Sequence, residues 1–515
     1  MANTSSGKYE VTARGDLHKL HSKAIGLPGV LFLTVTGAAP ISAMLFNVPI
    51  GVGYGNGLAA PAAFLVATII LLLFSVGYAA MARKVTAVGG FYSFISHGIG
   101  RPAGMALGFG SIVAYCVFEA SLCGGFAFFA NADVKQWFGV DVPWPWFAFA
   151  MVAVICALSY MDVKLSAMVL GVALIAEVVI LIIFDFGVFG HIGNGAVVSG
   201  AAVNPAGAFQ AFDAFKTPDG KDVAAGVAAI GLFFAFWSWV GFEMAPNYGE
   251  ESRDPKRIVP LSLYISVLGL GIFYTLTSWA AVSAYPDANT AIAKAANDGG
   301  NFFLDPAGAL VGNWAKDLMS VLILTSSFAC GMAFHNTAAR YIYSLAREGV
   351  LPGKLGRTHP NYRSPHVASS TQSVLAAIIV VLFMIFAGTN DPNAQAYLAL
   401  YGLMALMGTA LIMFAQALVS LAIILYFRKN HPEEHHWFET LLAPAIAFVA
   451  QIYIIYLLWA NIDFLGGGLS FAHAIPWIDL GILAVGFLAA FWLKSAKPEI
   501  YDQIGRLLYE GIPEK

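Results

Sequence analysis

Charged residues are scarce in this chain. Only 11% of its 515 residues are Asp, Glu, Lys or Arg, whereas 59% are hydrophobic. Soluble proteins carry about a quarter charged residues, so this composition excludes an ordinary soluble domain and indicates a polytopic membrane protein. The formal net charge of −3 offers no excess of basic residues, and no nucleic-acid partner is expected.

Cysteine is also rare, and patterns for binding metals or nucleotides are missing. The cysteines lie in apolar segments without metal-ligand spacing, which predicts small buried residues and neither a disulfide framework nor a metal site. They are Cys116, Cys123, Cys156 and Cys330. No Gly-x-x-x-x-Gly-Lys-Ser/Thr sequence occurs, so ATP is not the energy source within this chain and no cofactor is expected. The apolar segments hold no nucleophile–base pair or metal cluster, which argues against an enzyme.

Long apolar runs dominate what is present. They predict an all-α integral membrane protein of about 12 transmembrane helices. The runs lie at about 28–50, 58–82, 103–130, 145–161, 165–189, 223–249, 260–284, 316–343, 366–388, 396–426, 438–461 and 474–494. Together they form one transmembrane domain over 28–494, between an N-terminal tail, 1–27, and a C-terminal tail, 495–515. The first run is too long for the core of a cleavable signal peptide, so none is expected.

The positions of Lys and Arg predict the orientation in the membrane. If the N-terminus is cytoplasmic, 22 of the 27 basic residues fall on the cytoplasmic side, where such residues concentrate, and 5 fall outside. The outer ones are Lys135, Lys216, Lys221, Lys294 and Lys316. This pattern predicts a multi-pass protein of the cytoplasmic (inner) membrane with both termini cytoplasmic. Two long outer loops, about 190–222 and 285–315, are expected to cap an outer vestibule.

Two of the runs are interrupted by residues that break helices. The first contains Thr36-Gly-Ala-Ala-Pro40, and the sixth contains Gly241, Glu243 and Pro246. Glycine and proline can end a helix and free backbone groups for a ligand. Interrupted helices at corresponding places in two halves of a chain indicate the binding site of a secondary transporter. The alternative is a kinked helix in which Glu243 is bonded to a neighbour.

Several short stretches, each weak alone, occur in a specific order. They are Gly37-Ala-Ala-Pro40, Val88-Gly-Gly-Phe-Tyr92, Trp237-Ser-Trp-Val-Gly-Phe-Glu243, Gly249-Glu-Glu-Ser-Arg-Asp-Pro255, Asn336-Thr-Ala-Ala-Arg340 and Ala346-Arg-Glu-Gly-Val-Leu-Pro352. In these motifs, the chain resembles amino acid–polyamine–organocation superfamily permeases from about residue 24 to about 430. The resemblance implies a leucine-transporter-type fold. Spans 1–5 (about 28–189) and 6–10 (about 223–426) then form a 5+5 inverted repeat, followed by two C-terminal helices (about 438–494).

The resemblance also implies where a small-molecule substrate binds. Its carboxylate is expected at the amides of the first break, where a half-helix restarts at Pro40, and its ammonium at carbonyls freed by the second break. Many relatives have Gly-Ser-Gly at the first break, so this chain lacks a hydroxyl contact to the carboxylate there. The predicted substrate-binding residues are Thr36, Gly37, Ala38, Ala39, Glu119, Trp237, Ser238, Val240, Gly241 and Glu243.

Ionisable residues inside the spans suggest further roles. Glu119 and Glu243 together suit a cationic group, the alternative for Glu119 being structural hydrogen bonding. Glu177 lies where proton-coupled relatives often carry a lysine. With Ser326 and Ser327 it is the predicted coupling site, which takes up a proton or helps to bind a cation. The alternative is a permanently protonated Glu177 bonded inside the bundle. His335 is interpreted as a packed core histidine in preference to a proton relay.

These observations predict a secondary active transporter. It is expected to import an amino acid or small organic amine by alternating access, with the proton as coupling ion and the lipid bilayer as its surroundings. One alternative is an exchanger that trades an amine substrate for its metabolic product. Another is a nutrient sensor without net transport, which the short tails disfavour.

Overall fold

The computed structural model describes residues 26–85, 90–161, 165–192, 203–248, 252–362, 364–386, 395–465 and 469–505. Eleven stretches of these residues are long and apolar enough to cross a membrane. The first of them, Leu27–Ala82, contains two of the expected spans, so the count agrees with the prediction of about twelve. Residues 88–89 and 249–251 of the motifs quoted above lie outside the described residues, as do residues 1–25 and 506–515 of the tails.

The first half of the chain forms five spans, of which the first is interrupted. Its pieces are α2 (Leu27–Ala38), α3 (Pro40–Ser42), the π-helical η2 (Ala43–Asn47), α4 (Val48–Ile50) and the π-helical η3 (Gly51–Asn56). The one-turn η4 (Gly57–Ala59), α5 (Ala60–Ala82), α6 (Gly90–Gly98), α7 (Arg101–Phe138), α8 (Trp144–Met161) and α9 (Leu165–Gly190) follow. The short α6 buries Phe91, Phe94 and Ile95 against the bundle.

The second half repeats the pattern with an interrupted sixth span. This span consists of α10 (Ala228–Trp237) and the 3₁₀-helical η6 (Phe242–Tyr248). The other spans are α11 (Pro255–Ser283), α14 (Asn313–Arg347), α15 (His366–Phe386), η9 (Gln395–Tyr401) continued by α17 (Gly402–Asn430), η11 (Trp437–Leu442) continued by α18 (Ala443–Ala460), and α20 (Ile475–Ala496). The short η8 (Gly353–Gly356), η10 (Pro432–Glu434), α19 (Ile462–Leu465), η12 (Ser470–Ala474) and α21 (Pro498–Gln503) connect or end these helices.

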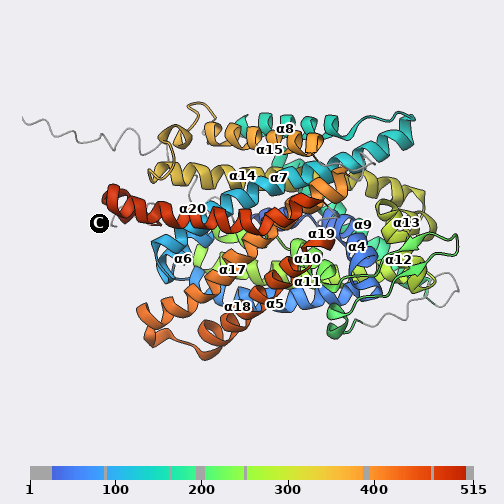
Figure 1. Ribbon diagram of the computed structural model, residues 1–515, viewed down its shortest axis with the longest axis horizontal. Helices are drawn as coiled ribbons and strands as arrows, with labels where there is room; N and C mark the ends of the chain where they lie inside the picture. The colour runs from blue at the N-terminus through green and yellow to red at the C-terminus, as the bar shows by residue number, and fades with distance from the viewer. Residues whose placement is uncertain are drawn as a thin grey trace, which may run out of the picture.

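The interrupted sixth span is much more buried than the last span. In the apolar part of Ala228–Asn247, 94% of the residues are buried, against 22% in Ser470–Ala496. The broken span therefore lies in the middle of the bundle, and the long helices run alongside it (Figure 1). Helix α20 packs on the outside of α7, where a Cβ on Gly486 would lie 2.7 Å from the carbonyl oxygen of Met105. Small residues permit such close backbone approach, which is a main source of helix association in lipid.

Segments between spans cover one end of the bundle. Helices α12 (Ala288–Asn297) and α13 (Leu304–Leu310), with η7 (Gly299–Asn301) between them, gather at the end of the bundle opposite α21, the red end of the described chain (Figure 1). The Tyr54 hydroxyl of the first span donates to the Ala296 carbonyl at 2.9 Å, so α12 is fixed directly over η3. The earlier outer loop forms η5 (Pro205–Phe209) and a small hairpin of β1 (Phe215–Lys216) and β2 (Asp222–Val223), with Phe215 opposite Val223.

Candidate substrate-binding site

The first span breaks at Ala39. This residue has φ 44°, the only positive φ of a non-glycine residue in the described part of the chain. The Ala39 amide still donates to the Val35 carbonyl at 2.9 Å, so it closes α2 and does not point at a ligand as the sequence had suggested. Pro40 then starts α3, where its missing N–H is no loss. The amides of Ile41 and Ser42 precede the first bond within the restarted helix, from Ala43 to Ala39, and that of Ile41 is taken by the Glu177 carboxylate.

The sixth span breaks between Trp237 and Phe242, and Glu243 helps to hold it open. The amide of Gly241 donates to the Glu243 carboxylate at 2.9 Å instead of to the Ser238 carbonyl one turn earlier. The second carboxylate oxygen of Glu243 accepts from the Tyr115 hydroxyl at 2.9 Å. Both oxygens of Glu243 are thus engaged by the protein at the helix break.

The two breaks touch each other through glycine backbones. Gly241 has φ 122°, and a Cβ built on it would lie 2.5 Å from the Gly37 carbonyl carbon. A Cβ on Gly37 would in turn lie 3.2 Å from the Gly241 Cα. The structure shows that the neighbouring backbone is that of the other broken helix.

A small cavity lies at this meeting point. Its walls come from both broken helices and from α7, α14 and η9, and its volume is about 20 Å³, room for about one water molecule. Its lining residues are Gly37, Ala38, Ala39, Ser42, Ala43, Asn47, Leu122, Trp237, Ser238, Val240, Cys330, Phe334 and Tyr401. None of these residues is charged. The buried Ser42 hydroxyl has no hydrogen-bond partner among the described residues, so it is available to a ligand.

A hydrogen-bonded network forms the polar wall of the cavity. The Trp237 indole N–H donates to the Tyr401 hydroxyl at 2.7 Å, and that hydroxyl donates to the Asn47 amide oxygen at 2.5 Å. The Asn47 amide nitrogen donates to Ser238 Oγ at 2.8 Å, which in turn donates to the Phe234 carbonyl at 2.7 Å. The network connects the first, sixth and tenth spans around the cavity.

The structure gathers six of the ten predicted substrate-binding residues on the cavity wall. These are Gly37, Ala38, Ala39, Trp237, Ser238 and Val240. Thr36, Glu119, Gly241 and Glu243 do not line it. Sequence reasoning missed Ser42, Asn47, Leu122, Cys330, Phe334 and Tyr401. For Asn47 a signal existed, because an amide within an apolar run just after a helix break needs a polar partner.

The predicted coupling residues are only partly assembled. Ser326 Oγ donates to the Glu177 carboxylate at 2.8 Å, linking α14 to α9. The backbone amide of Ile41 hydrogen-bonds to the same carboxylate, so Glu177 caps the restarted half of the first span. Ser327 instead donates to the carbonyl of Ile323 in its own helix at 2.6 Å.

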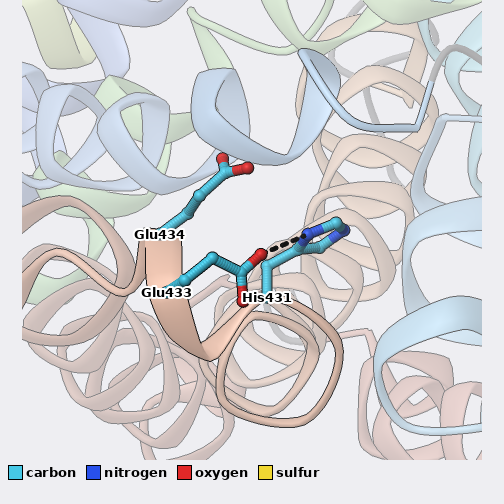
Figure 2. A group of neighbouring side chains, drawn as sticks. All are labelled: His431, Glu433 and Glu434. Atoms are coloured by element: carbon cyan, nitrogen blue, oxygen red, sulfur yellow. Dashed lines mark ion pairs between the residues drawn. The ribbon is translucent and has the colours of Figure 1, made fainter.

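A second polar cluster lies in the connection after α17, where His431, Glu433 and Glu434 come together (Figure 2). Their ligand atoms lie within 4.8 Å of one another, a geometry that sequence spacing did not predict. The Glu434 carboxylate, however, already pairs with the Lys84 ammonium at 2.6 Å, and Glu433 is largely exposed. Because the Glu434 carboxylate already has a protein cation as its partner, we assign the cluster to surface ion pairing.

Two broken helices meeting at a buried cavity, within a bundle of about twelve spans, define a membrane transporter of the leucine-transporter-type fold. A solved manganese transporter mutant from Eremococcus coleocola has this fold. It superimposes with a TM-score of 0.58 at 11% identity and covers 93% of this chain and 99% of its own.

The family is shown by a match to the amino acid permease family model over residues 25–486. The chain therefore belongs to the amino acid permease family. It is 23% identical to the branched-chain amino acid permease BcaP of Bacillus subtilis over 91% of this chain and 90% of that protein. It is 24% identical to the aspartate-proton symporter of the same organism, over 90% and 95% of the two chains. The low-affinity putrescine importer PlaP of Escherichia coli is 26% identical over 59% of this chain and 63% of its own length.

Replacing Gly241 with alanine tests the contact between the breaks. We expect Gly241→Ala to lose folded protein and substrate binding, because the Cβ meets the Gly37 backbone and the positive φ adds about 1–3 kcal/mol of strain. The measurement is the yield of monodisperse protein and its thermal stability. Gly269→Ala is the control, because nothing lies within 4 Å of a Cβ there. Equal stability of the two variants would contradict the assigned contact.

Removing the Tyr401 hydroxyl tests the polar wall. Tyr401→Phe leaves the Trp237 N–H and the Asn47 carbonyl oxygen without partners, and each unsatisfied buried group costs about 1–3 kcal/mol. We expect a lower melting temperature and weaker substrate binding. Tyr453→Phe, at a side chain that is 48% exposed, should leave both unchanged. If Tyr401→Phe also leaves both unchanged, the network does not shape the site.

Proposed function

We propose that this protein is a secondary active transporter that imports an amino acid across the cytoplasmic membrane by alternating access. The main observation behind this proposal is an uncharged, polar cavity where the two broken helices touch each other through Gly37 and Gly241. The names of its relatives support transport of an amino acid or a small organic amine. The excess of Lys and Arg in the predicted inner loops supports cytoplasmic termini.

The cavity favours a zwitterionic amino acid over a diamine. The Ser42 N–H lies at the positive end of a half-helix, and the Ser42 hydroxyl has no hydrogen-bond partner among the described residues, which suits a carboxylate. The Ser238 carbonyl, which the Gly241 amide does not use, suits an ammonium group. No carboxylate lines the cavity, so the second ammonium of a diamine has no charged partner there.

The small cavity also restricts the substrate side chain. Its apolar walls are formed by Leu122, Val240 and Phe334, and its present volume is about 20 Å³. Any amino acid is larger than this, so binding requires these side chains to move apart. Small or branched apolar side chains demand the least rearrangement and match the walls in polarity.

A ligand screen tests this substrate class. We expect neutral apolar amino acids to raise the melting temperature of the purified protein, because a ligand at 100 times its Kd stabilises by about 2.7 kcal/mol. Putrescine and arginine should shift it less. A larger shift with putrescine would overturn the amino-acid assignment in favour of an organic amine, while no shift with any amino acid or amine would oppose the transporter proposal itself.

Proton coupling is proposed at Glu177. Its carboxylate joins three elements that must separate for access to alternate: α9, α14 through Ser326, and the restarted first span through Ile41. Protonation removes the negative charge that holds the Ile41 amide and the Ser326 hydroxyl. A change of this kind shifts the balance between inward-facing and outward-facing states, which is what coupling requires.

Two transport assays in the same proteoliposomes test this coupling. Glu177→Gln mimics a permanently protonated side chain, so it should still exchange substrate across the membrane but fail to concentrate it under a proton gradient. Ser326→Ala should weaken accumulation, whereas its neighbour Ser327→Ala should behave as wild type because Ser327 bonds only within α14. Accumulation by Glu177→Gln at the wild-type level would exclude Glu177 as the coupling site. Exchange without accumulation in the wild type would identify the protein as an exchanger.

A further inference from the structure

A fully buried ionisable pair lies behind the cavity wall. The Glu119 carboxylate of α7 and the His335 imidazole of α14 are both 0% exposed, and His335 Nδ1 lies 2.9 Å from Glu119 Oε2. Two residues of α15 complete the cluster. Gln372 Nε2 donates to Glu119 Oε2 at 2.6 Å, and Ser369 Oγ lies 2.9 Å from His335 Nε2. Three helices therefore meet at one carboxylate.

The neighbours of the cluster fix its hydrogen-bond directions. The Cys116 thiol donates to the Gln372 amide oxygen, so the Gln372 amide nitrogen faces Glu119. Glu119 Oε2 then accepts one hydrogen bond from Gln372 and one from His335 Nδ1–H. A carboxylate oxygen that accepts two short hydrogen bonds is typically ionised. Glu119 Oε1 has no hydrogen-bond partner among the described residues, so a proton placed on that oxygen would find no acceptor.

Charge balance decides how many protons this cluster holds. A carboxylate without a countercharge at this depth in a membrane costs several kcal/mol. Among the described residues, the titratable groups around Glu119 are Cys116 and Cys123 on its own helix and His335 on α14. Helix α15 contributes two uncharged side chains, Gln372 and Ser369. The nearest titratable group on α15 in sequence is His366, one turn before Ser369. His335 is the group placed to carry the compensating positive charge.

We infer that Glu119 and His335 form a proton-binding site, separate from Glu177, that holds one proton as an imidazolium–carboxylate pair. The ligand is the proton itself. When it binds, His335 donates from both ring nitrogens, to Glu119 and to the Ser369 hydroxyl. When it leaves, the Ser369 hydroxyl turns and donates to Nε2 of the neutral ring. Only a hydroxyl rotation is needed, so the ring keeps both contacts in either state.

Polar residues of α15 give the pair a route to one face of the membrane. His366 begins α15, and Ser369, Gln372 and Ser373 follow at the spacing of helix turns. His366 is partly exposed, and its Nδ1 has no hydrogen-bond partner among the described residues. The basic residues near this helix end place it on the cytoplasmic side in the proposed orientation, so a proton would enter from the cytoplasm.

The pair is also placed to affect the substrate cavity. Phe118 and Phe334, the residues immediately before Glu119 and His335, have ring centroids 5.1 Å apart. Phe118 lies 4.4 Å from the ring of Trp237, which lines the cavity together with Phe334. Loss of the proton keeps these hydrogen bonds but removes the countercharge of the Glu119 carboxylate, so it raises the free energy of the packed arrangement of α7 and α14 at this wall. Substrate binding and protonation of the pair are thus expected to depend on one another.

The protonation state of His335 tests the inference directly and without any transport assay. Solid-state NMR of protein with isotope-labelled histidine distinguishes an imidazolium from a neutral ring, and the His335 signal is the one missing in His335→Gln. At about pH 7 we expect both His335 nitrogens to be protonated in the wild type and only one in Glu119→Gln. Glu439→Gln, a half-exposed surface carboxylate paired with Arg83, is the control that should not change the signal.

Two results would overturn the inference. One is a neutral His335 ring in the wild type across about pH 5–8, and the other is an imidazolium that persists in Glu119→Gln. If Glu119→Gln does not fold, the melting temperature of the wild type against pH provides the test. It should fall more steeply toward alkaline pH than that of the Glu119→Gln/His335→Gln double variant, because only the wild type loses a compensating proton. Equal pH dependence of the two proteins would also overturn it. These measurements do not depend on which solute the protein transports.

Discussion

The contact between the backbones of Gly37 and Gly241 is the constraint on which the rest of this structure depends. It brings two helix interruptions, about 200 residues apart in the sequence, within van der Waals distance in the middle of the bundle. Free backbone groups at this depth are tolerated only where protein or a ligand satisfies them. The left-handed conformation of Ala39 and the bond from the Gly241 amide to Glu243 fix where those groups point. The cavity exists because of both interruptions together.

Three buried glutamates show how surroundings give one residue type different roles. Glu243 has both oxygens bonded by Gly241 and Tyr115 and maintains a helix break. Glu177 caps a half-helix and accepts from Ser326, so its contacts change if the helices move. Glu119 has a titratable partner, His335, and one oxygen without a hydrogen-bond partner among the described residues. Because an unpaired charge is costly in the membrane, the partner of each carboxylate indicates its function better than its position in the sequence.

The relatives show that this fold does not determine the substrate. A manganese transporter shares the architecture at 11% identity, and proteins named for branched-chain amino acids, aspartate and putrescine share the sequence family. Selectivity among these relatives must therefore come from side chains and not from the fold. In this chain the cavity is lined by an amide, three hydroxyls, an indole, a thiol and apolar groups, with Asn47 and Tyr401 at the centre of the polar wall.

The sequence by itself determined the number of spans, the interruptions near Ala39 and Gly241, and the family. These are local properties, because a membrane helix needs about 20 consecutive apolar residues and only particular residues end one. Only the tertiary structure decided which side chains face the cavity. The spans are apolar on all sides, so no periodic pattern reveals how each helix is rotated. Glu119 and His335 are 216 positions apart in the sequence, so their pairing could not be predicted from it; the packing of α7 against α14 brings them together.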